Sequence, residues 1–440
     1  MTASMNDIRP DRLRRELGVG GATMMGLGSM VGTGVFVSIG IAAGVAGPAV
    51  IFAIVLAAAV ATCNALSSAQ LAASHAVSGG TYEYGYRYLN PTLGFTAGWM
   101  FLCAKTASAA TAALGFAGYF LRLIGVSLDQ VAWVAVAAVA LFTVLVLSGI
   151  KRSSWANVAI VSITLLALGS FVVFGLPTAT ANGADNLTPF FTSESGNVLE
   201  AFLYATALMF VAFTGYARIA TLGEEVTEPK RTIPRAIIVT LVVTALLYVT
   251  VAAVAIGSVG ADGFASSAGA QATPLEAAAR AMDAPFLARL VAIGAITAML
   301  GVLLNLILGL SRVLLAMGRQ GEMPSVFGRL SPAGAAPAPA VIAVGLLVAL
   351  LAAFGSLETA WAFSAFTVLV YYAITNLAAL QLPEDERLYP RWIAITGLLA
   401  CVFLAFWVPV PIWAAGLGLI GVGLLWKTFL SPRWRRDVQS

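Results

Sequence analysis

Glycine and lysine occur in this sequence at positions where a long apolar stretch would ordinarily hold neither. Residues 26–36 contain four glycines, Gly26, Gly28, Gly32 and Gly34, and each weakens a helix by roughly 1 kcal/mol relative to alanine. A helix interrupted here would expose backbone N–H and C=O groups that can bind a small polar molecule. The same glycines also fit close packing against a neighbouring helix, through pairs such as Gly28 with Gly32.

Lys105 lies in the middle of another apolar stretch, residues 92–121. A lysine near the centre of a bilayer is costly unless it is paired or faces water. Lys105 is more than ten residues from either end of the stretch, too far to reach an interface. Two roles of Lys105 stay open. In the first it carries a proton, because burial favours its uncharged form. In the second it is a fixed cation that repels lysine-like and arginine-like side chains and favours neutral or acidic substrates.

A second interruption is predicted in residues 210–218, where Gly215 lies between aromatic residues and Arg218 follows. One glycine alone is a weak signal. However, the two interrupted stretches would be the first helices of two halves of five helices each. Paired interruptions at corresponding positions are the strongest sequence indication of the central site of a secondary transporter.

The composition places these residues in a membrane. Of the 440 residues, 60% are hydrophobic and only 10% are charged, against about 25% in a typical soluble domain. No charged residue occurs between Glu16 and Glu83. A soluble globule of this size could not cover its surface with so few charges, which excludes a soluble enzyme, a nucleic-acid binder and a disordered chain.

Histidine and cysteine are too sparse for metal or hydrolytic chemistry. His75 is the single histidine, and Cys63, Cys103 and Cys401 lie in separate apolar stretches without metal-ligand spacing. We therefore expect buried thiols and no metal site. A membrane-embedded enzyme would need a nucleophile with its base, and a channel would need charged or polar pore rings; the sequence favours neither class.

Twelve apolar segments divide the chain, and their continuous hydrophobicity predicts membrane helices and not alternating β-strands. The segments are 19–43, 48–73, 92–121, 130–149, 155–176, 200–222, 236–258, 285–317, 337–355, 360–381, 391–408 and 410–429. In the connector 259–284, Thr273 and Pro274 followed by Glu276 predict the start of a short surface helix.

The distribution of lysine and arginine predicts the orientation of the chain. If the N-terminus is cytoplasmic, the outer segments hold only Arg122, Arg280 and Arg289 of the 24 Lys and Arg residues, Lys105 and Arg218 fall within spans, and the other nineteen lie inside. This asymmetry predicts an integral plasma membrane protein of the bacterial inner-membrane type with both termini cytoplasmic. It also explains the pI of about 9.0 without a nucleic-acid partner.

Five motifs, in this order along nearly the whole chain, resemble those of the amino acid–polyamine–organocation transporter family. They are residues 28–36 (GSMVGTGVF), 76–82 (AVSGGTY), 219–236, 311–324 and 371–377. Residues 219–236 are especially similar to the cationic amino acid transporter branch of that family.

The resemblance implies an all-α integral membrane fold with twelve transmembrane helices. Ten form a five-plus-five inverted repeat in which helices 1 and 6 are broken, and two more follow at the C-terminus. The implied divisions are a cytoplasmic segment 1–18, repeat 1 at 19–176, an extracellular loop 177–199, repeat 2 at 200–381, helices 11 and 12 at 382–429, and a cytoplasmic tail 430–440.

The resemblance also implies transport of an amino acid by alternating access, with the substrate held between the two breaks. Backbone amides of the first break would take the α-carboxylate, because a helix N-terminus carries a partial positive charge. Carbonyl groups of the second break would take the α-ammonium. The implied substrate-binding residues are Gly28, Ser29, Met30, Val31, Gly32, Thr33, Gly34, Phe210, Phe213, Thr214, Gly215 and Tyr216, the three aromatic ones as apolar walls or a gate.

The sequence departs from the family pattern where coupling groups are expected. Thr164 stands where proton-coupled relatives carry a lysine, and Ala104 and Lys105 stand where the branch often carries Glu and Tyr. We assign Lys105, Thr164 and Thr297 to coupling or selectivity, with Thr297 and carbonyls of the first span as a candidate Na⁺ cage. No cofactor is expected, and H⁺ and Na⁺ both stay open as the coupling ion.

Arg218, one turn past the second interruption, is either a solvated residue of an inner vestibule or part of a gate. In the second interpretation it pairs with Glu83, Glu224 or Glu225. The expected partners are therefore an amino acid substrate and the lipid bilayer, with no nucleic acid and the oligomeric state left open. The alternative function is a polyamine or cationic amino acid antiporter, or an uncoupled facilitator of the same fold. The branch motifs favour cationic substrates, whereas Lys105 argues against them.

Overall fold

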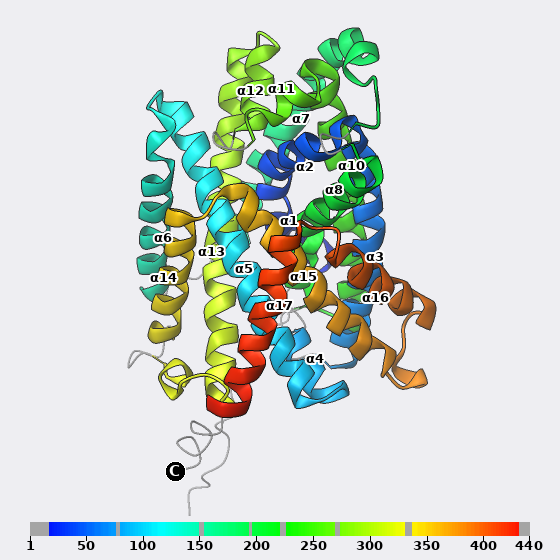
Figure 1. Ribbon diagram of the computed structural model, residues 1–440, viewed down its shortest axis with the longest axis vertical. Helices are drawn as coiled ribbons and strands as arrows, with labels where there is room; N and C mark the ends of the chain where they lie inside the picture. The colour runs from blue at the N-terminus through cyan, green and yellow to red at the C-terminus, as the bar shows by residue number, and fades with distance from the viewer. Residues whose placement is uncertain are drawn as a thin grey trace, which may run out of the picture.

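The chain folds into a bundle of long helices (Figure 1). The computed structural model describes residues 17–75, 80–148, 154–192, 196–220, 226–268, 273–330 and 337–430. Its α-helices are α1 (Val19–Met30), α2 (Ile39–Ala46), α3 (Val50–Ser74), α4 (Thr81–Tyr88), α5 (Pro91–Ile124), α6 (Val131–Leu147), α7 (Ser154–Asn186), α8 (Val198–Phe213), α9 (Ala217–Ala220), α10 (Pro229–Val259), α11 (Ala261–Ala265), α12 (Pro274–Ala281), α13 (Pro285–Arg319), α14 (Ala338–Phe354), α15 (Leu357–Leu380), α16 (Arg391–Ala405) and α17 (Val410–Leu425). Within the described ranges, extended pairing is limited to one β-bridge between Leu17 and Val226, so the all-helical prediction is confirmed.

The helices have the length and composition of membrane spans. In the described part of the chain, nine helical runs are long and apolar enough to cross a membrane. One of them, Val19–Ser74, contains two of the predicted spans, joined by the turn Gly47–Ala49. Two further apolar helices, α14 and α16, are shorter. The helical membrane architecture therefore follows the sequence, while the count of twelve spans and the inverted repeat stay predictions.

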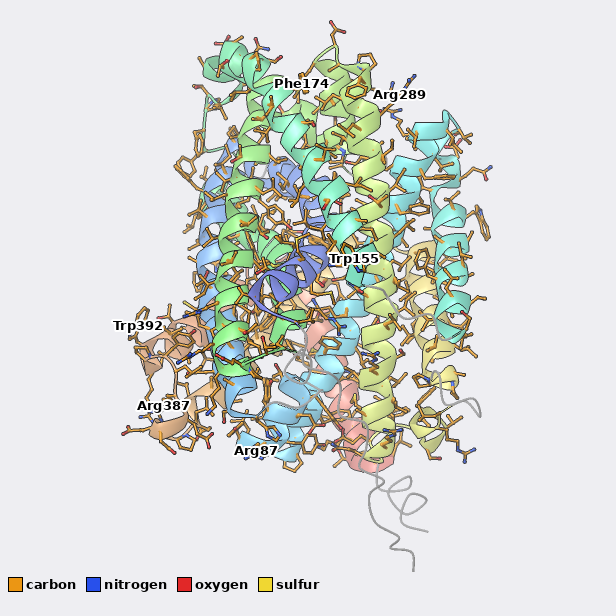
Figure 2. All side chains as sticks on the ribbon, turned by 180° about the vertical axis from the view of Figure 1, so that it is seen from behind. Arg87, Trp155, Phe174, Arg289, Arg387 and Trp392 are labelled. Atoms are coloured by element: carbon orange, nitrogen blue, oxygen red, sulfur yellow. The ribbon has the colours of Figure 1, made fainter. Side chains whose placement is uncertain are left out.

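The side chains sort by polarity in the manner of a protein surrounded by lipid. Large apolar side chains such as Trp155, Phe174 and Trp392 are exposed on the outer surface (Figure 2). Buried polar residues, by contrast, lie inside the bundle; the side chain of Asn376 in α15, for example, donates a hydrogen bond to the side-chain oxygen of Asn64 in α3. Such an arrangement suits an apolar solvent, because a polar group left unpaired in hydrocarbon would be costly.

Both predicted interruptions are present, but they differ in kind. After Met30 the backbone leaves the helical region at Val31, with φ −80° and ψ 93°, and then winds into a π-helical turn, Gly34–Ser38, before α2. The second interruption is tighter than expected: α8 ends at Phe213, a single 3₁₀ turn covers Thr214–Tyr216, and α9 follows at once. Only the first interruption opens the backbone.

Two connecting segments contain helices. The short helix predicted at Thr273 and Pro274 exists as α12, which buries Leu275, Glu276 and Ala279 and exposes Arg280. The segment predicted as the loop 177–199 is partly helical, because α7 continues to Asn186 through its internal Pro177. Asn186 donates a hydrogen bond to the carbonyl of Gly257 at 2.9 Å, and this contact holds the extension of α7 against α10.

The turn Trp426–Leu430, which follows α17, is held to the bundle by a buried carboxylate. Glu322, which follows α13, accepts a hydrogen bond from the hydroxyl of Tyr82 in α4 at 2.8 Å, and its backbone carbonyl accepts one from the indole of Trp426 at 3.0 Å. Its carboxylate lies 3.9 Å from Nζ of Lys427. Lys427 also lies over the ring of Phe95 in α5, at 5.3 Å from the ring centre. Three distant parts of the chain therefore meet at one ion pair.

We expect Lys427→Met to lower the free energy of unfolding by about 3 kcal/mol, because it removes a cation from beside a fully buried carboxylate. The measurement is a thermal melt of the detergent-solubilised protein. The double variant Glu322→Gln with Lys427→Met should recover part of the loss, since it also removes the buried negative charge. Lys230→Met, at an exposed lysine, is the matched control. A single Lys427→Met variant that melts with the wild type would show that the ion pair does not stabilise the fold.

Candidate substrate site

A cavity of about 330 Å³ lies between the two interruptions. Residues of α1, α5, the 3₁₀ turn after α8, α13 and α15 line it. It extends from the interruptions toward α4, where Tyr82 and Tyr84 form part of its wall. In Figure 1, α4 lies at the end of the bundle opposite α11 and α12, so the cavity leads from the middle of the bundle to one end.

The first interruption supplies unpaired backbone donors to this cavity. The amides of Val35 and Phe36 both bond to the carbonyl of Gly32, at 3.1 and 3.2 Å. Within the described segment, the amides of Gly32, Thr33 and Gly34 find no backbone acceptor. They lie at the start of the π-helical turn that leads into α2, so they form the N-terminal end of a half-helix, which carries a partial positive charge. Such an end is a ready binding site for a carboxylate.

The two interruptions touch each other, which explains two of the glycines. A Cβ atom at Gly34 would lie 2.6 Å from Cβ of Ala212 and 3.1 Å from its Cα. A Cβ atom at Gly215 would lie 2.5 Å from the carbonyl oxygen of Ser29. Because these contacts involve backbone atoms, a larger residue at either position would push the two segments apart. Glycine at both positions is therefore required by the packing of the two interruptions against each other.

Aromatic side chains from two other helices bind the carbonyl groups that the interruptions leave free. The hydroxyl of Tyr248, in α10, donates to the carbonyl of Met30 at 2.7 Å and lies 3.4 Å from the carbonyl of Ala212. Tyr372, in α15, donates to the carbonyl of Thr214 at 3.2 Å. Sequence reasoning missed both tyrosines as site residues. The available signal was the presence of a tyrosine within an apolar span, because a buried tyrosine hydroxyl needs a hydrogen-bond partner.

Lys105 reaches the second interruption. Its Nζ donates to the hydroxyl of Thr214 at 2.9 Å, and this hydroxyl donates in turn to the carbonyl of Val211 at 2.8 Å. Arg218 and Arg312 also line the cavity. Among the described lining residues there is no aspartate or glutamate, so the charged groups that they contribute are all cations.

The structure brings only part of the predicted binding set to the cavity. Ser29, Met30, Thr33, Gly34, Thr214 and Gly215 line it, whereas Gly28, Val31 and Gly32 are not among its lining residues. Gly28 faces Asn157, whose side chain donates to the carbonyl of Met24 at 2.8 Å.

The three predicted aromatic walls, Phe210, Phe213 and Tyr216, are fully buried and are not among the lining residues. Phe210 and Tyr216 pack against Tyr372, and Phe213 packs against Tyr248, with ring centres 5.2–5.8 Å apart. These side chains hold the tyrosines that bind the interruptions. The aromatic residues that do reach the cavity include Phe101, Trp361 and Tyr371.

Neither of the two threonines assigned to coupling lines the cavity. The hydroxyl of Thr164, in α7, donates to the carbonyl of Ile160 at 2.8 Å. The hydroxyl of Thr297, in α13, lies 3.0 and 3.1 Å from the carbonyls of Ile293 and Gly294. Both hydroxyls are thus used within their own helices.

The predicted gate residues are only partly described. Arg218 lies on the cavity wall. Glu83, in α4, lies off the cavity and accepts a hydrogen bond from Gln320 at 3.4 Å. Burial raises the pKa of the Glu83 carboxyl. Glu224 and Glu225 lie outside the described residues, so the gate stays a prediction.

Comparison with known proteins identifies the chain. A family model described as amino acid permease matches residues 21–434. The chain belongs to the amino acid permease family. An uncharacterised transporter of Mycobacterium tuberculosis is 43% identical over 415 residues, which cover 94% of this permease and 91% of the relative. The branched-chain amino acid permease BcaP of Bacillus subtilis is 30% identical over 418 residues, covering 89% and 88%.

A plant relative supports the same family at greater distance. The vacuolar cationic amino acid transporter 4 of Arabidopsis thaliana is 27% identical over 367 residues, 78% of this permease and 59% of the relative. The family predicted from the motifs is confirmed, and so is the conclusion that the protein is a transporter and not an enzyme.

We expect Tyr248→Phe to reduce uptake by the permease at least tenfold while it lowers the free energy of unfolding by only about 1–3 kcal/mol. The substitution keeps the packing of the ring and removes the donor to the carbonyls of Met30 and Ala212. Uptake into proteoliposomes and a thermal melt measure the two effects. Tyr204→Phe, in α8, removes a half-buried hydroxyl away from the cavity and is the control. Equal uptake in both variants would contradict the prediction.

The contact between the interruptions gives a second prediction for the permease. Gly34→Ala should abolish uptake, because the new Cβ would displace the backbone at Ala212. Gly20→Ala, in the same region of the chain, meets no atom within 4 Å and should transport normally. The measurement is initial uptake rate at matched protein levels. Normal transport by Gly34→Ala would show that the close approach is not needed.

Proposed function

We propose that this permease is a secondary transporter of amino acids with neutral, mainly apolar side chains. The observation that carries the proposal is the cavity wall, where unpaired amides of the first interruption face a space whose charged side chains are all basic. The α-carboxylate would bind the amides of Thr33 and Gly34, which line the cavity. The α-ammonium would bind backbone carbonyls of the second interruption.

The charges on the wall support exclusion of cationic side chains. A substrate ammonium or guanidinium about 8 Å from Lys105 would be repelled by about 2 kcal/mol at an effective dielectric constant near 20. A penalty of that size corresponds to roughly thirtyfold weaker binding. For this reason the polyamine and cationic amino acid alternative is not favoured.

The uncharged part of the lining supports an apolar substrate side chain. Met30, Phe101, Val211, Val302 and Trp361 present apolar surface to the cavity. An apolar side chain gains free energy from such a surface when it leaves water. The name of the Bacillus subtilis relative, a branched-chain amino acid permease, agrees with this choice, whereas the plant relatives are named for cationic amino acids.

Transport would follow from exposure of the cavity to each side in turn. In the predicted orientation the cavity opens toward the cytoplasm, the side on which α4 lies. The proposal includes the twelve-span inverted repeat, since rocking of one half against the other around a fixed central site is the mechanism that such repeats permit.

Lys105 is the proposed selectivity group, and its contact with Thr214 holds it at the second interruption. It is also the candidate for H⁺ coupling. Na⁺ coupling would need a cage near Thr297, and the hydrogen bonds of that hydroxyl to its own helix give no support for one. We therefore propose H⁺ as the coupling ion, with no other cofactor.

Competition of leucine uptake in proteoliposomes tests the substrate class. Neutral apolar amino acids should compete best, and glutamate and arginine poorly. In Lys105→Met, arginine should compete roughly tenfold better than it does with the wild type, because the repelling charge is gone. The control is Lys230→Met, an exposed lysine away from the cavity. Arginine as the best competitor of the wild type would overturn the proposed substrate class.

The pH profile of uptake tests the coupling role separately. If Lys105 carries the proton, Lys105→Met should lose the dependence of leucine uptake on an imposed pH gradient, and replacement of Na⁺ by K⁺ should change nothing. An unchanged response to the pH gradient in Lys105→Met would remove the proton role and leave the selectivity role intact.

A further inference from the structure

A second pocket, of about 270 Å³, lies at the end of the bundle away from α4. The end of α5, the helix α12 and the start of α13 form it, and its charged lining consists of Arg122, Glu276, Arg280 and Arg289. Figure 2 shows Arg289 at the opposite end of the bundle from Arg87, which belongs to α4. The pocket is therefore remote from the substrate cavity, and the two share no lining residue.

The charged side chains that line this pocket carry a net positive charge. Glu276 is buried, and its two carboxylate oxygens bond to different arginines: one lies 3.4 Å from Nε of Arg122, and the other accepts from Nε of Arg280. No ion pair of Arg289 is found within the described residues. The described lining therefore holds three guanidinium groups and one carboxylate, a formal net charge of +2.

The pocket lies where the apolar surface of the bundle begins. Ile124, at the end of α5, and Phe286, at the start of α13, are both exposed beside it, and one turn beyond Arg289 the side chain of Ile293 is exposed as well. A pocket that combines basic groups with adjacent outward-facing apolar residues matches the boundary between headgroups and acyl chains of a bilayer.

We propose that this arginine pocket binds the phosphate group of an anionic phospholipid, whose acyl chains lie against the exposed apolar residues of α5 and α13. Guanidinium groups present paired N–H donors that match the oxygens of a phosphate. Glu276 holds Arg122 and Arg280 in place, so these two are organised before the lipid arrives. Arg289 supplies the charge that Glu276 does not neutralise.

The arginines could bind a lipid headgroup phosphate or free phosphate equally well. Only the lipid would also contact the exposed apolar residues beside the pocket. A soluble anion would gain only the arginine contacts. A lipid would add burial of its chains against Ile124, Phe286 and Ile293, which contributes roughly 25 cal/mol for each Å² of apolar surface covered.

The test is a titration of the delipidated, detergent-solubilised permease with phosphatidylglycerol, phosphatidylcholine or sodium phosphate, followed by thermal melting. A ligand of the folded state raises the melting temperature by mass action. Phosphatidylglycerol should raise it, while phosphatidylcholine and sodium phosphate at the same concentration should not. Equal shifts with both lipids, or a full shift with sodium phosphate alone, would overturn the proposal of an anionic lipid.

Matched arginine variants assign the effect to the pocket. Arg289→Gln should bind phosphatidylglycerol about tenfold more weakly, the loss expected for one charge-assisted contact. Arg329→Gln removes one exposed arginine outside the pocket and should bind as the wild type does. An equal loss in the two variants would show general attraction to a basic protein, and no loss in Arg289→Gln would remove the site. Because the readout is lipid binding, the result is independent of whether the transport proposal holds.

Discussion

The structure depends on one constraint: a helix interrupted inside an apolar medium must have its freed backbone groups bound by something else. The carbonyl of Met30 receives the hydroxyl of Tyr248, and that of Thr214 receives the hydroxyl of Tyr372. The amides of Thr33 and Gly34, which line the cavity, have no backbone acceptor and are left for a ligand. Each of these two carbonyls therefore already accepts one hydrogen bond from the protein, whereas the amides have none. This asymmetry explains why the site would recognise a carboxylate first.

Small residues and tyrosines act together in this arrangement. Glycines at 34 and 215 allow the interrupted segments to touch, and the tyrosine hydroxyls can bridge the segments only because they are so close. Lys105 adds a third connection from α5 through Thr214. The segments that line the cavity are thus joined by side chains of other helices, and a displacement of either segment must change contacts in α5, α10 and α15.

Sequence reasoning predicted the features that follow from local composition. Glycine spacing indicated the first interruption, and the position of Lys105 in its apolar stretch indicated a residue of the central site. Contacts between residues far apart in the chain were not predictable: 218 positions separate Tyr248 from Met30. The extension of α7 through Pro177 was missed for a related reason, because its contact with Gly257 is tertiary and leaves no periodicity in the sequence. The aromatic residues of α8 were assigned by motif alone, and packing places them behind the cavity.

The fastening of Glu322 by Lys427 has a consequence for how the chain is made. The two residues lie about a hundred positions apart, with α14 to α17 between them. During synthesis, Glu322 is made about a hundred residues before Lys427, so this ion pair cannot form until α17 has been made. A product truncated before Lys427 never forms it. The turn that follows α17 thus joins a part of the bundle that was made much earlier.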